Sequence, residues 1–385
     1  GYRLISTGIA FGSRTTVFEG LDTEIKFQYI ETDTRILRTA SLNHIHDQAP
    51  CPGAIQIKSQ TTPLQEADKV IVKLERSKQR SATETRQRTC PVMIDRGMSL
   101  MTVETPQAAL IAIYDLLEGK TSYPQAFTVL RASKLMKTKI KGLHFATSLI
   151  GENGPDPKAE RLQTPLILID FDMGEVLNDE TKGGPKPRTG TPIFMAGVVR
   201  SGKINEGPHY FPPMPQLQAG LENYLKHLPS RLEAFPPNQE ADKRLHDDMI
   251  LEKFQHELRY DAESVFWLLL WWAIQAKPEA SDSDEDFIPK AIWESLTWGG
   301  EKQDGRRYFI DPFPKKILHP SYRPLETLLR AMSLQLAGDL GLMESRSDPE
   351  YLHEAFQRLI FEFLSEHSSK NSDFLILTKS RRLRE

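Results

Sequence analysis

The sequence predicts an α+β protein in which a small strand-rich part precedes a larger helical part. Residues 1–97 contain short segments in which apolar and polar residues alternate, as in β-strands. Residues 98–385 contain segments whose apolar residues recur at helical spacing. Because strands and helices are segregated along the chain, we expect a bilobal α+β fold whose N-lobe (1–97) and C-lobe (98–385) meet near Gly97.

The strand-rich part begins with alternation over residues 1–30, which predicts two or three strands joined by tight turns. Residues 31–44 have a helical pattern, and residues 76–88 are expected to be a charged, solvated stretch. Further strands are expected at residues 55–57, 69–74 and 91–95.

The helical part begins with an amphipathic helix over residues 105–118, with Pro106 near its first position and Gly119 just past its end. A helix over 125–141 and an apolar strand over 165–169 follow, and residues 175–215 are expected to hold little regular structure. Later helices are expected over residues 217–227, 241–256, 261–275, 289–298, 324–340 and 349–366.

The composition is that of an ordinary globular protein, with 39% hydrophobic and 26% charged residues. A formal net charge of −3 gives no general attraction to nucleic acid or to an anionic membrane, so neither is expected as a partner. Two cysteines without zinc-like spacing indicate the cytoplasm or nucleus. No apolar run reaches the roughly 18–20 residues of a membrane span, and the longest, residues 265–274, is about half that length and suits a buried core helix. The chain starts at Gly1, which leaves open whether residues precede it.

Two charged segments carry alternative interpretations. The basic end, residues 379–384, is expected to be solvated and frayed rather than a nuclear-import or docking signal. The acidic run over residues 281–286 is expected to be an exposed loop, with phosphorylation by a casein-kinase-type enzyme as the alternative.

Asp170 is the strongest candidate site residue. It stands at the end of the apolar strand 165–169, where a carboxylate is costly unless it is paired or bound to a cation. Asp170 is therefore expected to be paired or to bind a cation, with an acidic turn that binds no metal as the alternative.

Three segments resemble parts of a protein kinase in the same order. Residues 169–172, Ile-Asp-Phe-Asp, resemble the magnesium-binding Asp-Phe-Gly strand, and 190–196, Gly-Thr-Pro-Ile-Phe-Met-Ala, resemble the end of an activation segment that would span 170–198. Residues 260–271 resemble the buried helix whose Asp, here Asp261, braces the catalytic loop. The alternative for Asp261 is a helix N-cap. The Ile-Asp-Phe-Asp strand and the helix that contains Asp261 are similar to those of the fungal-type protein kinases. This resemblance covers residues 91–365 in detail and residues 1–90 in outline.

The resemblance implies a site for ATP and Mg²⁺ with Asp170 as the magnesium ligand, although it leaves open whether they bind. Gly8, Gly12 and Val17 stand where kinases have the glycine loop over the phosphates, with only two of three glycines matched. Ile94, Asp95 and Gly97 would form the hinge, whose backbone from Asp95 to Gly97 faces adenine.

A kinase also needs a lysine for the α- and β-phosphates and an acid that holds this lysine. Chain order favours Lys26, whereas Lys73 has the better local motif. The acid partner of Lys26 would be Glu31 or Asp33, both unusually close in sequence.

The catalytic loop lacks its carboxylate. If His144 begins the His-Arg-Asp motif, Ala146 replaces the catalytic Asp; if Asn153 is the motif Asn, Ser148 replaces it. Either register predicts slow or absent phosphoryl transfer, as in a pseudokinase that binds a protein partner. The alternatives are a divergent Ser/Thr kinase that acts on a protein substrate and a small-molecule phosphotransferase, which would also need the missing Asp. Val198 likewise stands where the activation segment normally has the Glu that pairs with a C-lobe Arg.

Overall fold

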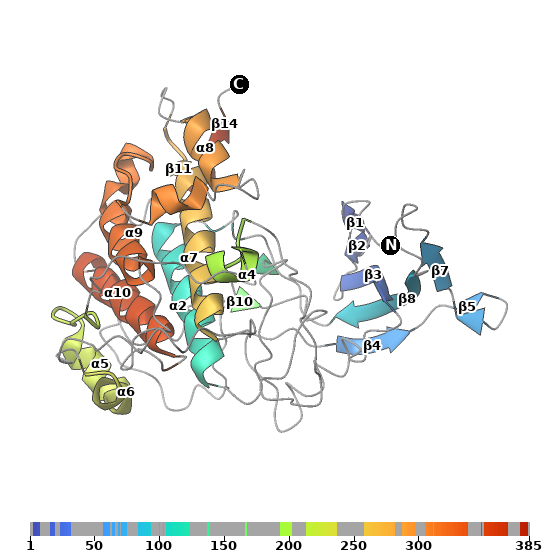
Figure 1. Ribbon diagram of the computed structural model, residues 1–385, viewed down its shortest axis with the longest axis horizontal. Coiled ribbons are helices and arrows are strands. Elements are labelled where there is room, and N and C mark those ends of the chain that lie inside the picture. Colours follow the sequence, from blue (N-terminus) through green and yellow to red (C-terminus); the bar gives the residue numbers. More distant parts are fainter. Residues whose placement is uncertain are drawn as a thin grey trace.

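The computed structural model describes eight strands before residue 94 and a largely helical assembly after residue 100 (Figure 1). The described residues are 3–7, 16–19, 24–31, 57–61, 64–65, 68–69, 71–74, 84–93, 100, 103, 105–122, 137–138, 166–167, 193–201, 213–236, 258–281, 287–297, 305–310, 312–337, 348, 350–368 and 378–383. The six-stranded sheet therefore precedes the helical assembly along the chain, and this segregation is typical of the α+β class, whereas the two-lobed arrangement stays a prediction.

The N-terminal residues form an antiparallel six-stranded sheet. Its order is β1-β2-β3-β8-β4, and β7 also pairs with β8. The strands are β1 (Arg3–Thr7), β2 (Thr16–Glu19), β3 (Glu24–Glu31), β4 (Ile57–Thr61), β7 (Ile71–Leu74) and β8 (Glu84–Met93), and β5 (Leu64–Gln65) pairs separately with β6 (Asp68–Lys69). Strands thus lie where the alternation over residues 1–30 predicts them.

Strand β8 is longer than the sequence indicates. Residues 84–88, expected to be a charged, solvated stretch, form the first half of this strand. β8 lies inside the sheet, between β3 on one side and β4 and β7 on the other. Pairing with neighbours on both sides outweighs the low strand preference of its charged residues.

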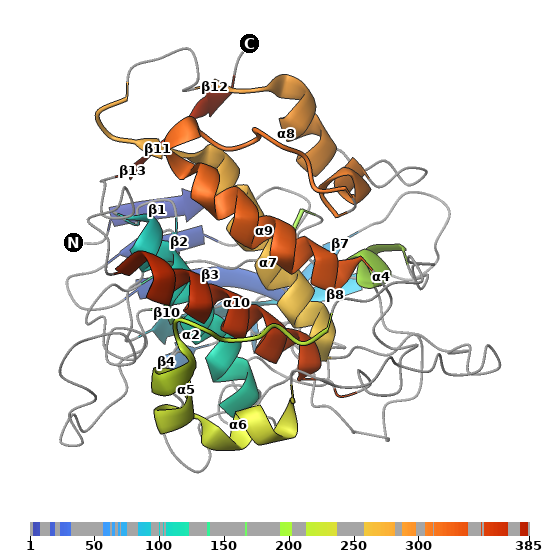
Figure 2. The same ribbon diagram turned by 90° about the vertical axis from the view of Figure 1, so that its left-hand side faces the viewer.

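Four long helices form the centre of the helical assembly: α2 (Pro106–Ser122), α7 (Leu258–Gln275), α9 (Arg323–Leu336) and α10 (Tyr351–Ser368). Helix α10 contacts α2, α7 and α9, and α2 and α9 both contact α7 (Figures 1 and 2). The shorter elements are α4 (Gly197–Ser201), α5 (Leu221–His227), α6 (Pro229–Ala234), α8 (Lys290–Thr297) and the 3₁₀ helices η5 (Gly305–Phe309) and η6 (Pro320–Tyr322).

Helix α7 is the core helix of this assembly. Phe266 and Leu270 are fully buried, and Trp267 and Trp272 are each 1% exposed. A helix that is apolar around its whole circumference is stable only when other elements surround it. The prediction of a buried core helix over residues 265–274 is therefore confirmed. No helix among the described residues combines the length and apolarity that crossing a membrane requires.

The C-terminal residues return to the end of α7. β13 (Thr378–Ser380) pairs antiparallel with β11 (Ala276–Pro278), and β14 (Arg382–Leu383) pairs parallel with β12 (Phe287–Ile288).

Arg381, which joins β13 to β14, anchors this return. Its side chain is buried, and its guanidinium donates hydrogen bonds to the carbonyls of Ile274, Phe287 and Ile317 at 2.6–3.2 Å. Ile274 lies in the last turn of α7, where a cation is favoured by the helix dipole. The expectation of a solvated, frayed basic end is wrong over residues 378–383, because strand pairing and this buried arginine hold it.

Other differences concern the bounds of elements. Helix α2 continues through Gly119 to Ser122, since a glycine in a last turn costs only about 1 kcal/mol. The helix expected over 125–141 is wrong at residues 137–138, which form strand β9 (Lys137–Thr138). Helix α4 falls in a segment expected to lack regular structure. Helices α5 and α7 to α10 are present with shifted ends, and α6 was not expected. The helix expected over 31–44 is wrong at Glu31, which ends β3, and its other residues and the helix expected over 241–256 lie outside the described residues.

Candidate functional site

Two of the residues predicted to bind nucleotide lie in described strands. Val17 lies in β2 and Lys26 in β3, and the two are cross-strand partners. Residues 8–15, the predicted glycine loop, connect β1 to β2 along the chain and contain both candidate glycines. Since β3 pairs directly with β2, the topology brings Lys26 next to the strand that leaves this loop. A lysine on the third strand is the arrangement by which kinases hold the α- and β-phosphates.

Lys73, the alternative lysine, lies elsewhere in the sheet. It belongs to β7 and pairs with Thr85 of β8. β3 and β8 therefore separate β7 from the strand that follows the glycine loop. The strand order favours Lys26 over Lys73 as the lysine nearer that loop.

Glu31, one of the two candidate acid partners of Lys26, is the last residue of β3 and so lies on the same strand as Lys26. Most of the remaining predicted site residues lie outside the described residues, and their roles stay predictions. These are Gly8, Gly12, Asp33, Ile94, Asp95, Gly97, His144, Ala146, Ser148, Asn153 and Asp170. β8 ends at Met93, directly before the predicted hinge.

A strand precedes Asp170, as expected. It is β10 (Leu166–Ile167), which pairs antiparallel with β9 and contacts α2. Ile167 is opposite Lys137, so the end of β10 that leads to Asp170 lies beside the start of β9. Residues 142–153, the predicted catalytic loop, belong to the connection between these two strands. The described residues contain no group of three or more His, Cys, Asp or Glu that could hold a metal ion.

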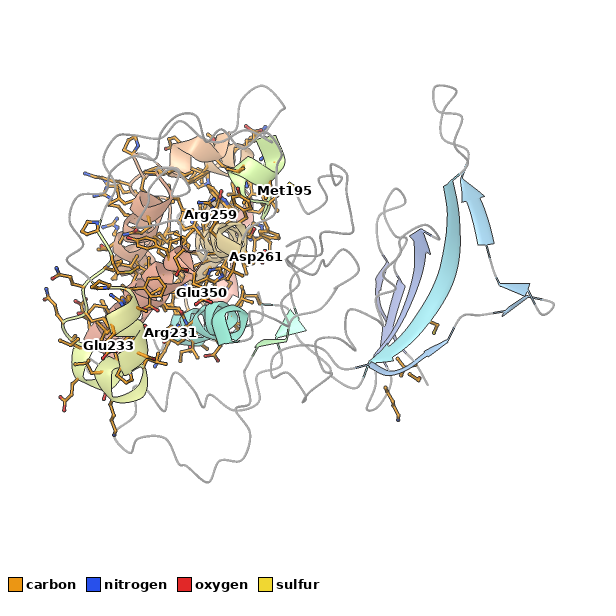
Figure 3. The ribbon with its side chains drawn as sticks, turned by 60° about the horizontal axis from the view of Figure 1, so that its bottom comes forward. Met195, Arg231, Glu233, Arg259, Asp261 and Glu350 are labelled. Atoms are coloured by element: carbon orange, nitrogen blue, oxygen red, sulfur yellow. The ribbon has the colours of Figure 1, made fainter. Side chains whose placement is uncertain are left out.

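Asp261 is the predicted structural residue that the structure describes in full. It is 4% exposed and lies in the first turn of α7, three residues after Leu258. The N-cap alternative is therefore wrong, because the helix begins before this residue. In Figure 3, Asp261 and Met195 lie at the side of the helical assembly nearer the sheet, whereas Arg231 and Glu233 lie at the opposite side. The loop that Asp261 is predicted to brace lies outside the described residues.

Glu263 fixes the start of α4, the helix that follows the activation-segment-like motif. Its Oε1 accepts hydrogen bonds from the main-chain N–H of Gly197 at 2.8 Å and from the indole N–H of Trp267 at 3.0 Å. The N–H of Gly197, the first residue of α4, has no acceptor within its own helix. A carboxylate at this end also complements the helix dipole. Glu263 therefore caps α4 and ties it to α7.

Arg306 holds the residues just before α4. Its side chain is buried, donates a hydrogen bond to the main-chain carbonyl of Met195, and lies over Trp267 with 4.7 Å between the guanidinium carbon and the ring centre. Phe194 contacts Trp271 edge-on, with 5.6 Å between ring centres. The segment end is thus attached to α7 by polar and aromatic contacts.

Val198, which replaces the expected acid, is buried with apolar neighbours. It forms a small cluster with Met195, Ala196, Val199 and Tyr260. Burial of a carboxylate there would be unfavourable without a partner, so valine suits this position.

Sequence reasoning missed the roles of Glu263 and Arg306. The available signal for Glu263 was its position four residues before Trp267, which places both side chains on one face of a helix. Arg306 lies far away in sequence, and no local pattern pointed to it.

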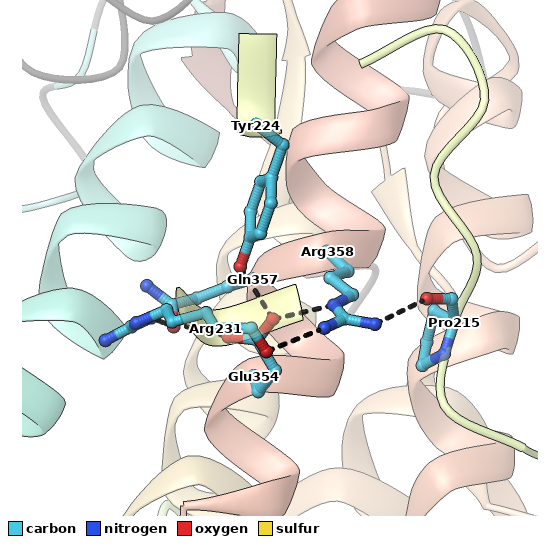
Figure 4. A network of polar contacts seen from close by, with 6 residues as sticks. All are labelled: Pro215, Tyr224, Arg231, Glu354, Gln357 and Arg358. Atoms are coloured by element: carbon cyan, nitrogen blue, oxygen red, sulfur yellow. Dashed lines mark hydrogen bonds and ion pairs between the residues drawn. The ribbon is translucent and has the colours of Figure 1, made fainter. Parts of the chain in front are cut away.

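A second buried polar network involves residues of α5, α6 and α10 (Figure 4). Glu354 of α10 accepts hydrogen bonds from the Tyr224 hydroxyl and the Arg358 Nε, both at 2.6 Å, and lies 3.4 Å from Arg231. The Arg231 Nη1 also donates to the side chain of Gln357 at 2.7 Å. Burial, together with the Glu354 charge, raises the pKa of Tyr224 far above its usual value. The network joins α5 and α6 to α10, which indicates a structural role.

No family model matches the chain, and no curated protein matches it. Among solved structures, the Cydia pomonella granulovirus kinase PK-1 is similar over 92% of this chain and 94% of that chain, at 11% sequence identity and a TM-score of 0.40. A similarity of this size does not establish a shared fold, and the proposal below rests on the residues of this chain.

Proposed function

We propose that this chain is a protein-kinase-like protein of the fungal type with a degenerate catalytic loop, and that it acts by binding a protein partner. In this proposal ATP and Mg²⁺ are ligands of a retained nucleotide site. Lys26 and the glycine loop hold the phosphates, and Asp170 holds the metal.

The attachment of residues 194–199 to α7 carries this proposal. In a kinase that is switched on by phosphorylation, the activation segment becomes ordered when its phosphate forms ion pairs with arginine side chains. Here Glu263 and Arg306 hold the end of the segment through main-chain atoms, and Val198 is buried among apolar residues. Because these contacts need no phosphorylation, residues 194–199 are better suited to a fixed binding surface than to an activation segment that changes between an ordered and a disordered state.

The chemistry of the predicted catalytic loop agrees with this proposal. General-base catalysis needs a carboxylate or another base within reach of the substrate hydroxyl. Neither Ala146 nor Ser148 supplies a carboxylate at the expected position. Without it, bound ATP would be held and not consumed.

A divergent active Ser/Thr kinase is the second candidate. The position of Lys26 on β3, opposite Val17, favours it, because this lysine serves phosphoryl transfer as well as nucleotide binding. The two candidates differ in whether phosphate is transferred.

Thermal unfolding with and without ATP and Mg²⁺ tests nucleotide binding. A ligand at 100 times its Kd adds about 2.7 kcal/mol to the free energy of unfolding, which is visible as a higher Tm. We expect a magnesium-dependent rise in Tm that Asp170→Asn abolishes and that Asp172→Asn, a matched change in the same turn, retains. Lys26→Met should weaken the rise, and Lys73→Met should not.

Transfer of label from γ-labelled ATP to protein distinguishes the two candidates. We expect no transfer above the level seen with Asp170→Asn. Label transfer that Asp170→Asn abolishes would establish an active kinase and overturn the pseudokinase proposal. No rise in Tm in any variant would overturn the retained nucleotide site.

A further inference from the structure

Ser281 combines an acidic sequence context with an unusual structural environment. It begins the run Ser-Asp-Ser-Asp-Glu-Asp, with acidic residues one, three, four and five positions later. The residue closes a tight turn after β11, in which its main-chain N–H donates to the carbonyl of Pro278 at 3.2 Å. Glu279 and Ala280 in the middle of this turn are exposed. Ser281 itself is half-buried and stands between this exposed turn and the acidic run.

Two hydrogen-bond donors surround the half-buried Ser281. The hydroxyl lies 3.2 Å from His319 Nε2. His319 Nδ1 accepts a hydrogen bond from the main-chain N–H of Ser321, so the proton of the neutral imidazole is on Nε2, which donates to Ser281. The ammonium of Lys277 donates to the main-chain carbonyl of Ser281 at 3.0 Å. An imidazole N–H and a cation thus lie at one serine.

We propose that Ser281 is a phosphorylation site for an acidophilic Ser/Thr kinase, and that the phosphate fastens the C-terminal strand to the helical assembly. In the reaction the Ser281 Oγ forms a bond to the γ-phosphorus of ATP, the bond from that phosphorus to the β-phosphate oxygen breaks, ADP leaves, and the hydroxyl proton passes to the kinase or to solvent. The phosphate carries a charge of about −1.5 to −2 and three acceptor oxygens. His319 Nε2–H donates to one of them, and Lys277 forms an ion pair.

The position of these donors links the phosphate to the C-terminal strand. Lys277 lies in β11 and pairs directly with Lys379 of β13. His319 lies two residues after Ile317, and the carbonyl of Ile317 accepts a hydrogen bond from Arg381. A phosphate that joins Lys277 to His319 therefore fixes both elements against which residues 378–381 lie. The inference does not depend on the nucleotide site.

The test uses the full chain, a purified acidophilic Ser/Thr kinase and ATP. Mass spectrometry locates the phosphate, and limited trypsin digestion measures the rate at which the C-terminal segment is released. We expect phosphate on Ser281 and a release about tenfold slower, the effect of one added charge-assisted hydrogen bond.

Three variants sharpen this test. Ser281→Ala should gain no protection on treatment, whereas Ser283→Ala, a matched change in the same acidic run, should gain it in full. Lys277→Met should still accept phosphate on Ser281 but lose most of the protection. Phosphate on Ser283 alone, or phosphate on Ser281 with release unchanged or faster, would overturn the proposal.

Discussion

Removal of the Glu354 carboxylate should strongly destabilise the helical assembly. The side chains of Glu354 and Arg358 are 2% and 1% exposed, and their atoms Oε1 and Nε are 2.6 Å apart. Glu354→Ala would leave the Arg358 guanidinium buried without its anion. It would also remove the acceptor of the Tyr224 hydroxyl.

The expected loss follows from this burial. Breaking a buried ion pair by removing one partner costs about 3–5 kcal/mol, because a buried charge is left uncompensated. This is a large fraction of the roughly 5–15 kcal/mol by which folded proteins are stable. An exposed pair offers the matched control: Lys290 and Glu294 are 4.0 Å apart, with side chains 74% and 50% exposed. Glu294→Ala should cost no more than about 0.5 kcal/mol.

Urea unfolding followed by tryptophan fluorescence measures both losses. Trp267 and Trp272 lie in α7, which packs against α10, so their emission reports on this core. Glu354→Gln should cost less than Glu354→Ala, because the amide oxygen still accepts one hydrogen bond.

A small loss would refute this reasoning. If Glu354→Ala costs less than about 1 kcal/mol, close to the loss for Glu294→Ala, then the carboxylate does not compensate a buried charge. The double change Glu354→Leu with Arg358→Met provides a second check. It should cost less than Glu354→Ala alone, since neither charge remains.

Two further predictions concern titration and the activation-segment-like motif. Tyr224 has a raised pKa, so above about pH 10 the unfolded chain loses a phenolic proton that the folded chain retains. Stability should therefore fall as pH rises past 10, and Tyr224→Phe should reduce this slope by up to about 1.4 kcal/mol per pH unit in urea unfolding at pH 9–11; an unchanged slope would contradict the burial of the hydroxyl. Glu263→Ala leaves two donors without an acceptor and should cost about 2 kcal/mol, with faster hydrogen exchange at Gly197 than in Glu263→Gln. Equal exchange in both variants would show that the carboxylate does not cap α4.

The sequence predicted those parts of the fold that depend on local periodicity. The three strands over residues 1–30 follow from alternation, and α7 follows from an apolar run too short for a membrane span. The strand before Asp170 follows from its apolar residues. In each case neighbours in sequence determine the structure.

Features that depend on distant residues could not be predicted. The charged first half of β8 becomes a strand because β3 and β7 pair with it. The basic end is held because Arg381 reaches carbonyls at positions 274, 287 and 317, which no local pattern brings together. Of the candidate site, the pairing of Lys26 with Val17 follows from chain order, whereas Arg306 acts on Met195 across 111 residues.

The attachment of the segment end has a consequence for mutational tolerance. Glu263 and Arg306 contact the main-chain atoms of Gly197 and Met195, which every amino acid except proline offers in full. The two polar contacts therefore do not depend on which side chains stand at 195 and 197, although packing still favours an apolar residue at 195. The anchoring residues, rather than the motif that they hold, are then the better marker of related chains.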